Sequence, residues 1–231
     1  MPAPHWIHSA ATRWACTGIA LAAAACAPLP PKPAKTSEAP PVAAACPPAL
    51  AALASCLAGQ DSAGAYYLIA MPHQWNGHLV LHAHGGPALG APRPERSAAD
   101  LERWAIMVKA GYAWAGSTFR QGGVEVRAAA EDTERLRQIF VGHVAQPRRT
   151  ILHGQSWGAS VAARGAEMFT STTQGQRPYD AVLLTSGVLA GGSRSYDFRT
   201  DLRVVYQYLC NNHPRPTEVQ YPLNIGLPAE A

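Results

Sequence analysis

The feature that most constrains the fold is an alternation of short apolar runs with helical patterns between residues 78 and 187. The runs that read as strands are 78–84, 112–117, 150–154 and 181–187. Between them, apolar residues recur at helical spacing, as Leu136, Ile139 and Phe140 do. Strands that alternate with helices form mostly parallel sheets with helices on both faces. The predicted fold class is therefore α/β, with a mostly parallel sheet.

Local signals add further elements to this alternation. Residues 65–71 form another predicted strand. The turn dipeptide Asn76–Gly77 follows it, so this strand is expected to form a hairpin with 78–84 or to lie next to it. Ser97 and Asp100 have the spacing of a capping box, and Gly111 ends the helix that follows.

The later elements are predicted in the same way. Glu131 and Asp132 are expected in the first turn of the next helix, and 181–187 is expected to be a buried strand. A loop should follow Gly187, and a helix should then run from about Phe198 to Cys210.

One motif in this alternation has chemical meaning. Residues 154–158 read Gly-Gln-Ser-Trp-Gly, the spacing G-x-S-x-G, between a predicted strand and a helix of small residues. This spacing suits a nucleophilic serine on a sharp strand-to-helix turn. Ser156 is therefore the predicted nucleophile. The alternative is a tight turn in which the Ser156 side chain only caps the helix.

Acyl transfer also needs hydrogen-bond donors for the developing oxyanion. The backbone N–H of Trp157 opens the helix after Ser156 and supplies one candidate. The run His84-Gly85-Gly86-Pro87 ends the strand 78–84, and glycine lets a backbone turn its N–H toward a ligand. Gly85 and Gly86 are thus further candidates, unless the run is a plain glycine turn.

The two motifs together resemble the α/β-hydrolase superfamily of serine hydrolases, which includes esterases, lipases and some peptidases. The resemblance covers about residues 60–190. It implies the α/β-hydrolase fold without a cofactor. Residues from about 191 to 231 would form the start of a lid. The HGGP and SWG pair is also similar to that of prolyl aminopeptidases, but Ala88 replaces the last glycine of their HGGPG loop.

A catalytic triad of this superfamily follows the order Ser, acid, His. His213 is the sole histidine after Ser156, and it stands in a predicted loop. Asp197 and Asp201 follow the last strand and are formal candidates for the acid, although Asp201 fits better as an N-terminal helix residue. Asp180 stands at the wrong end of its strand. We therefore expect the chain to lack the C-terminal part of the domain, including the triad acid and histidine.

The other histidines have structural interpretations. His78, His82 and His84 share one strand face without carboxylate or cysteine partners, so no metal site is predicted. His153 should be a core histidine with its hydrogen bonds satisfied, and His143 should end a helix.

The N-terminal residues indicate export. Residues 1–25 fit a signal peptide, since their apolar run, 15–25, is shorter than the roughly 20 residues that span a bilayer. Cys26 resembles the acylated cysteine of bacterial lipoproteins, and the Pro-rich residues 26–45 would then be a tether. The predicted location is the periplasm or cell envelope, with Cys26 as a membrane tether, or the secreted fraction. The hydrolase domain is assigned to 46–231.

Export permits disulfides, so Cys46 and Cys56, which bracket a predicted short helix, are an expected pair, with two free thiols as the alternative. Cys210 then has no partner within the chain.

These features lead to three functional hypotheses. The first is an exported serine hydrolase that cleaves a carboxylic ester through an acyl-enzyme on Ser156. The second is a prolyl-type aminopeptidase, and the third is a non-catalytic or inactive truncated hydrolase. The substrate is a small-molecule ester or peptide. A nucleic-acid partner is not expected, because the net charge is only +4 and the basic residues are scattered.

Overall fold

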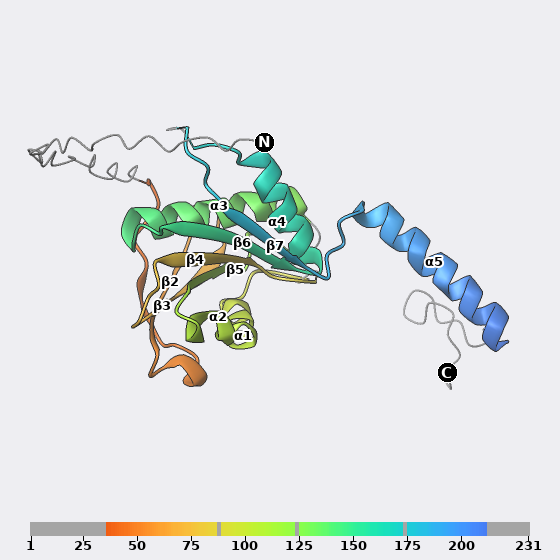
Figure 1. Cartoon of the computed structure of the whole chain (residues 1–231), viewed down its shortest axis with the longest axis horizontal. Coiled ribbons are helices and arrows are strands. Elements are labelled where there is room, and N and C mark those ends of the chain that lie inside the picture. Colours follow the sequence, from red (N-terminus) through yellow and green to blue (C-terminus); the bar gives the residue numbers. More distant parts are fainter. Residues whose placement is uncertain (1–35, 87–88, 123–124, 173–174, 212–231) are drawn as a thin grey trace, which may run out of the picture. The chain divides into compact units, whose positions relative to one another are not determined.

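The computed structural model describes residues 36–86, 89–122, 125–172 and 175–211. These residues form a seven-stranded sheet with the order β1-β2-β3-β5-β4-β6-β7 (Figure 1). The strands are β1 (Val42–Ala44), β2 (Ala54–Gln60), β3 (Tyr66–Pro72), β4 (His78–Ala83), β5 (Ala113–Ser117), β6 (Arg149–Gln155) and β7 (Ala181–Thr185). β4 to β7 pair in parallel, whereas β1, β2 and β3 pair antiparallel with their neighbours. β2 consequently runs with β4 to β7, so the predicted mostly parallel sheet is confirmed.

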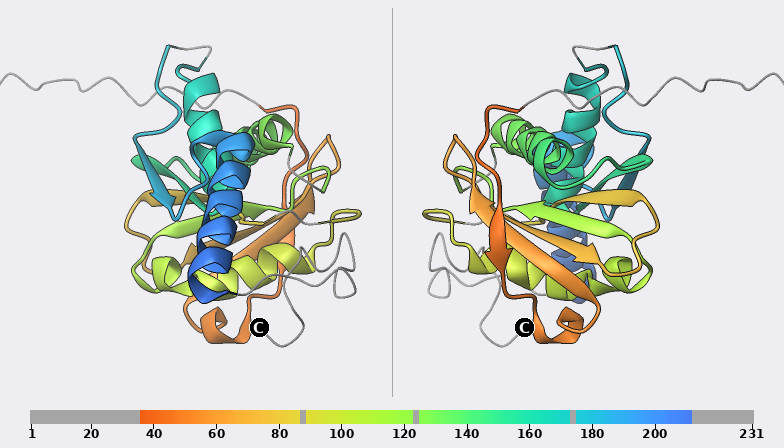
Figure 2. Two further views of the ribbon diagram at one scale, coloured as in Figure 1. Left: turned by 90° about the vertical axis from the view of Figure 1, so that its right-hand side faces the viewer. Right: turned by 90° about the vertical axis from the view of Figure 1, so that its left-hand side faces the viewer.

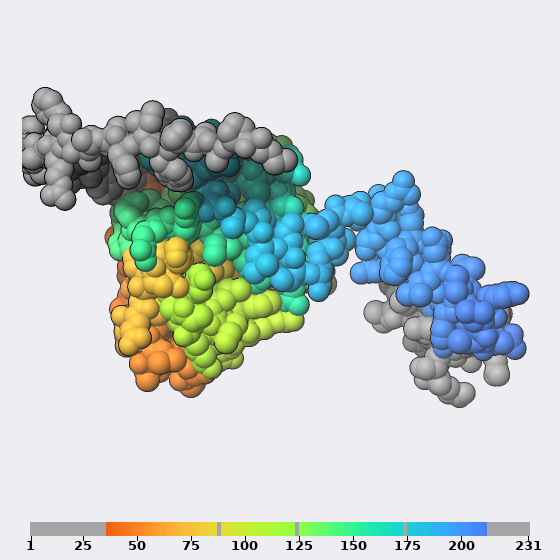
Figure 3. Space-filling view, viewed as in Figure 1, coloured from red at the N-terminus to blue at the C-terminus, as the bar shows by residue number. Residues whose placement is uncertain are grey.

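Helices cover both faces of this sheet, as predicted. The helices of the described residues are η1 (Pro48–Leu50), α1 (Glu95–Arg103), α2 (Ala105–Lys109), α3 (Val126–His143), α4 (Trp157–Met168) and α5 (Gly191–Cys210), of which α5 buries no residue. α3 and α4 lie on one face and α1 and α2 on the other, in the views of both Figure 1 and Figure 2. Figure 3 shows the yellow-green residues, which include α1 and α2, as a continuous patch on the surface.

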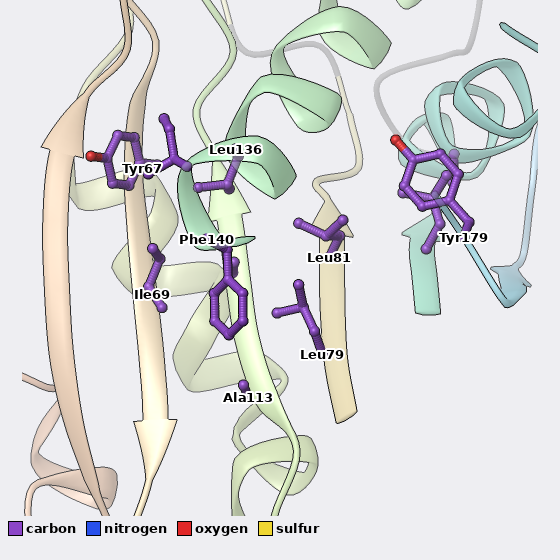
Figure 4. Close-up of a cluster of buried hydrophobic side chains, with 12 residues drawn as sticks. Tyr67, Ile69, Leu79, Leu81, Ala113, Leu136, Phe140 and Tyr179 are labelled. Atoms are coloured by element: carbon purple, nitrogen blue, oxygen red, sulfur yellow. The ribbon is translucent and has the colours of Figure 1, made fainter. Parts of the chain in front are cut away.

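Alternation along the strands explains the two layers. Leu79 and Leu81 of β4 pack with Leu136 and Phe140 of α3, in the cluster drawn in Figure 4. Val80, between them in the sequence, belongs instead to the cluster under α1 and α2. Successive side chains of a strand point to opposite faces, so β4 is buried on both.

The predicted partner of the strand at 78–84 is wrong. β3 and β4 are neither a hairpin nor neighbours, because β5 lies between them and pairs with both. β1 and β2 have no predicted counterpart, and η1 covers only three residues of the predicted short helix. The β2 sequence, ASCLAGQ, contains mainly small and polar residues, so its strand character comes from pairing rather than from its own pattern.

Several predicted helix boundaries are also wrong. Ser97 does not cap a helix, because α1 begins at Glu95 and buries Ser97 in its interior. A break at Trp104 divides the predicted helix into α1 and α2. Asp132 lies beyond the first turn of α3, which begins at Val126. Tertiary packing sets these helix boundaries, and the capping and glycine signals of the sequence contain no information about that packing.

β7 and α5 differ most from the prediction. β7 is not a buried strand, since Val182 and Leu183 are 41% and 47% exposed. Its sole neighbour in the described part of the sheet is β6. α5 begins at Gly191, where a loop was expected, and has no buried residue. In the described ranges, no helix combines the length and the apolar character that a membrane crossing requires.

The N-terminal part of the domain begins earlier than predicted. Residues 42–44, assigned to the tether, form β1 and pair with β2, so the core does not start at residue 60. A disulfide joins Cys46 to Cys56, with Cα atoms 5.2 Å apart. Cys210 is a free, exposed thiol.

A buried ion-pair network joins the start of the domain to α3 and to the loop after β5. Asp132 has no exposed surface and accepts hydrogen bonds from Arg120 Nε at 2.7 Å and Arg135 Nη1 at 2.9 Å. Arg135 also pairs with Glu38 at 3.3 Å and with Asp61 at 3.6 Å. Burial raises the pKa of Asp61, and the nearby Asp132 adds to this rise. The network thus joins α3 to three other segments that are distant in the sequence, which contain Glu38, Asp61 and Arg120.

The replacement Asp132→Ala should lower the free energy of unfolding by about 3 kcal/mol, because it removes the fully buried carboxylate that Arg120 and Arg135 share as a partner. Urea denaturation measures this change. The control Glu167→Ala removes an exposed i,i+3 partner of Arg164 and should cost at most about 1 kcal/mol. Equal losses in the two variants would contradict the importance of the network.

Candidate active site

Ser156 occupies a sharp turn between β6 and α4. Its backbone has φ 53° and ψ −120°, a left-handed conformation that a residue with a side chain adopts only under constraint. The backbone N–H of Ser156 donates to Thr185 O at 2.9 Å, and its carbonyl accepts from Ala159 N at 3.1 Å. These bonds hold the turn from both sides, as in a nucleophile elbow.

The Ser156 side chain does not cap α4. Ser156 is the N-cap residue, yet no hydrogen bond runs from its side chain to the helix, which contradicts the capping alternative. Among the residues that the structure describes, none shares a hydrogen bond with Ser156 Oγ. The half-buried residue therefore presents a free hydroxyl at the carboxyl edge of the sheet.

Close backbone contacts explain the glycines of the motif. A Cβ on Gly154 would overlap the carbonyl oxygen of Gly158, and a Cβ on Gly158 would overlap the carbonyl oxygen of Ala83. The first turn of α4 thus lies directly on the end of β4 and on the residue two before Ser156. Larger residues at either position would force this turn away from the sheet.

The glycine loop after β4 lies beside the elbow. β4 and β6 are parallel neighbours with Ala83 opposite Gly154, so the residues after each strand emerge together. A Cβ on Gly85 would come within 2.7 Å of Gln155 O and 3.3 Å of Ser156 Cβ. Gly86 has φ +72°, which favours glycine.

The predicted oxyanion donors are therefore close to Ser156. Trp157 is the first residue of α4, and the first N–H groups of a helix have no intrahelical partner. Gly86 and Trp157 line a small cavity together with Phe119 and Glu125. Pro87 and Ala88, the rest of the loop motif, fall outside the described residues.

The structure does not bring a triad together from the predicted candidates. His213 falls outside the described residues. Asp197 and Asp201 lie on α5 with no buried neighbour, and Asp197 is 3.7 Å from Arg194. Asp180 directly precedes β7 and pairs with Arg149 at 2.7 Å, at the end of the strands opposite to Ser156. No acid or histidine is hydrogen-bonded to Ser156 within the described ranges.

Phe119 and Arg96 lie near the loop and have no counterpart in the predicted site, and both contact His84, the first residue of the predicted HGGP run. His84 is buried, stacks on Phe119 with ring centroids 4.3 Å apart, and has Nε2 3.4 Å from Thr118 O. Burial lowers the pKa of His84, although the carboxylate of Asp100 opposes this shift. Arg96 of α1 donates to Gly85 O at 2.7 Å. The sequence neighbourhoods of Phe119 and Arg96 carry no motif, because only the fold brings α1 and the loop after β5 to this edge.

A buried histidine pair lies beneath the elbow. His82 and His153 have their Nδ1 atoms 2.9 Å apart, and each Nε2 lacks a hydrogen-bond partner in the described part of the protein. His153 is therefore only partly satisfied, contrary to prediction. Trp104 packs edge-on against His153 at 4.5 Å, and Trp114 stacks on His82 at 5.6 Å. Burial lowers the pKa of His153 to about 4 and that of His82 well below its ordinary value, so both rings are neutral near pH 7.

The sheet, its two helix layers and the elbow make this an α/β-hydrolase fold. No protein-family model matches the sequence, and no curated protein matches it. Among solved structures, the chain is similar to an esterase of the bacterial hormone-sensitive lipase family, with 19% identity and a TM-score of 0.45 over 58% of this chain and 44% of that chain.

Two other solved structures are similar in the same partial way. LipA, a rice cell wall degrading esterase from Xanthomonas oryzae, has 16% identity and a TM-score of 0.40, over 57% of this chain and 40% of that one. Lipase A from Candida antarctica has 12% identity and a TM-score of 0.46, over 65% and 40%. The alignments span less than half of each of these proteins, and at these TM-scores they do not decide the activity.

Because His82 and His153 are buried as neutral rings, the protein should lose stability in mild acid. Unfolded His153 titrates near 6.5 and folded His153 at about 4, so the unfolded state binds more protons between these values. The contribution of His153 to the free energy of unfolding is complete above the pKa of the unfolded state, 6.5. It is lost as the pH falls toward the pKa of the folded state, about 4. At about 1.4 kcal/mol per pKa unit, His153 should account for a loss of about 3 kcal/mol.

Urea denaturation of wild type and His153→Gln across this pH range measures the effect. The variant should lose less stability than wild type as the pH falls from 6.5 to about 4, because it lacks the buried imidazole. A pH dependence of His153→Gln as steep as that of wild type would refute the assignment.

Proposed function

We propose that this chain is a serine hydrolase that cleaves a carboxylic ester through an acyl-enzyme on Ser156. The observation that carries the proposal is the conformation of Ser156: a left-handed residue at the end of β6 whose hydroxyl does not cap α4. A strained backbone that frees a hydroxyl has a cost in stability and is most often found where chemistry needs it.

The reaction would proceed in two steps. Ser156 Oγ attacks the ester carbonyl carbon while its proton passes to a base, and the alcohol leaves as the ester C–O bond breaks. Water then cleaves the acyl-enzyme and releases the carboxylic acid. In both steps the N–H groups of Trp157 and Gly86 would stabilise the oxyanion, with Gly85 shaping the loop.

The general base and its acid are proposed to come from outside the described residues. A serine hydroxyl is a weak nucleophile without a base, and the described residues offer none to Ser156. His213 lies in the part of the chain for which no structure is described. The activity proposed here therefore belongs to the full-length protein.

A second candidate function is an aminopeptidase of the prolyl type, and Glu125 is the observation in its favour. Such an enzyme needs a carboxylate to bind the free α-amine of its substrate, and Glu125 lies beside Gly86 and Trp157, around a cavity of about 10 Å³ that must widen to admit the amine. Turnover of prolyl arylamides in preference to aryl esters, with a rise in KM in Glu125→Gln, would favour this candidate over the esterase.

Labelling by a fluorophosphonate probe tests the role of Ser156. The full-length protein should be labelled on Ser156 and should hydrolyse p-nitrophenyl esters, and Ser156→Ala should abolish both, because the nucleophile is lost. Ser160→Ala is the matched control on the next turn of α4, where Oγ donates to Val188 O, and it should retain labelling. Undiminished ester turnover in Ser156→Ala would sink the proposal, and an unlabelled full-length protein would favour the non-catalytic hypothesis.

We also propose that the protein is exported and tethered to a membrane by acylated Cys26. The support is the sequence of residues 1–26, which lies outside the described residues. In a bacterial host, Cys26→Ser should abolish incorporation of radiolabelled palmitate and move the protein from the membrane to the soluble fraction. Unchanged fractionation of Cys26→Ser would argue for ordinary secretion or for another anchor.

A further inference from the structure

Arg96 makes a contact that the proposed reaction mechanism does not yet use. Its Nη2 donates to the carbonyl oxygen of Gly85 at 2.7 Å, the shortest of its contacts with the loop after β4. The same nitrogen lies 3.5 Å from Nδ1 of His84. Arg96 belongs to α1, so this bond ties a helix on one face of the sheet to the loop beside Ser156.

We propose that Arg96 is a positioning residue for the oxyanion site, because it fixes the orientation of the Gly85–Gly86 peptide and so directs the N–H of Gly86. This inference rests on the function proposed above. It adds a residue on α1 to a site that otherwise consists of the two loops after β4 and β6.

The geometry of the peptide bond links the Gly85 carbonyl to the N–H of Gly86. In a trans peptide the carbonyl oxygen and the N–H point in opposite directions. A carbonyl of Gly85 that is held by Arg96 on the side of α1 therefore directs the N–H of Gly86 away from α1. The Cα of Gly85 faces the elbow, since a Cβ there would lie 3.3 Å from Ser156 Cβ.

This peptide needs an external restraint. Both of its residues are glycines, and Gly86 has φ +72°, so rotation of the peptide plane meets little steric resistance. The rotated form would exchange the positions of the carbonyl and the N–H. It would thereby remove a donor from the oxyanion site and bring a partial negative charge toward it.

The charge of Arg96 adds to this effect. A guanidinium is charged at all working pH values, and its hydrogen bonds to neutral acceptors are stronger than those of neutral donors. A carbonyl polarised in this way makes the N–H of the same peptide a better donor. Arg96 thus both orients and strengthens the donor without touching the substrate.

Neighbouring residues hold Arg96 in place. Asp100, one turn further along α1, lies 3.4 Å from Arg96 Nε, and the carboxylate side chain is 12% exposed. His84 is fixed by its stacking on Phe119, and its own Nδ1 is 3.3 Å from Gly85 O. Arg96 is therefore held beside the Gly85 carbonyl as its donor from α1, and His84 Nδ1 is a second donor to this carbonyl in the tautomer that carries the proton on Nδ1.

A kinetic comparison on the full-length protein separates this role from a surface ion pair. In Arg96→Met, kcat for a p-nitrophenyl ester should fall by about 10²-fold, the order expected when one oxyanion donor is lost, with KM little changed. Arg96→Lys keeps a charged donor and should be intermediate. Arg164→Met is the matched control, because Arg164 is 43% exposed, against 41% for Arg96, and is likewise paired on its own helix. It should retain wild-type kcat.

Crystal structures of wild type and Arg96→Met provide a test that does not depend on activity. The Gly85 carbonyl should face α1 in wild type and should be rotated, or present in two orientations, in the variant. An unrotated carbonyl in Arg96→Met, or a wild-type kcat in that variant, overturns the inference. A wild-type protein without ester turnover contradicts the proposed function instead, and the carbonyl orientation then still decides the role of Arg96.

Discussion

The arrangement of the site depends on one close contact between the backbones of α4 and β4. Gly158, in the first turn of α4, lies so near the carbonyl of Ala83 that no Cβ fits between them. The same turn leaves no room for a Cβ at Gly154. Because α4 begins directly on the sheet, the chain must turn within a single residue, and Ser156 takes the left-handed conformation that this requires. The conformation of Ser156, whose hydroxyl does not cap α4, is thus a consequence of how closely this helix packs on the sheet.

The parallel pairing of β4 with β6 extends this constraint to the glycine loop. With Ala83 opposite Gly154, the loop after β4 and the elbow after β6 leave the sheet at the same level. β5 follows the same register, with Ser117 opposite Ala83, and brings Phe119 against His84. Arg120, next to Phe119, is bound by the buried carboxylate of Asp132 on α3. The two helix layers thus support the carboxyl edge from opposite sides, α3 through Asp132 and α1 through Arg96.

Local patterns of apolar residues predicted the strands correctly where the strand is buried in the structure. The strands at β3, β4, β5 and β6 were recognisable because apolar and β-branched residues cluster there. β1 and β2 carried no such signal, and the exposed β7 carried a misleading one. The neighbour relation of β3 and β4 was also wrong, because a turn dipeptide says nothing about a third strand that enters between two others.

The sequence by itself determined the fold class and the Ser156 and Gly85–Gly86 motifs. The spacing of apolar residues and the positions of glycines are local properties that act directly on the backbone conformation. Only the tertiary structure decided that Ser156 does not cap α4, that His82 and His153 form a buried pair, and that Arg96 reaches Gly85. The histidine pair and the bond from Arg96 join different elements of the fold, and the conformation of Ser156 follows from the packing of α4 on β4. They depend on strand register and helix packing, for which a single sequence contains no direct signal.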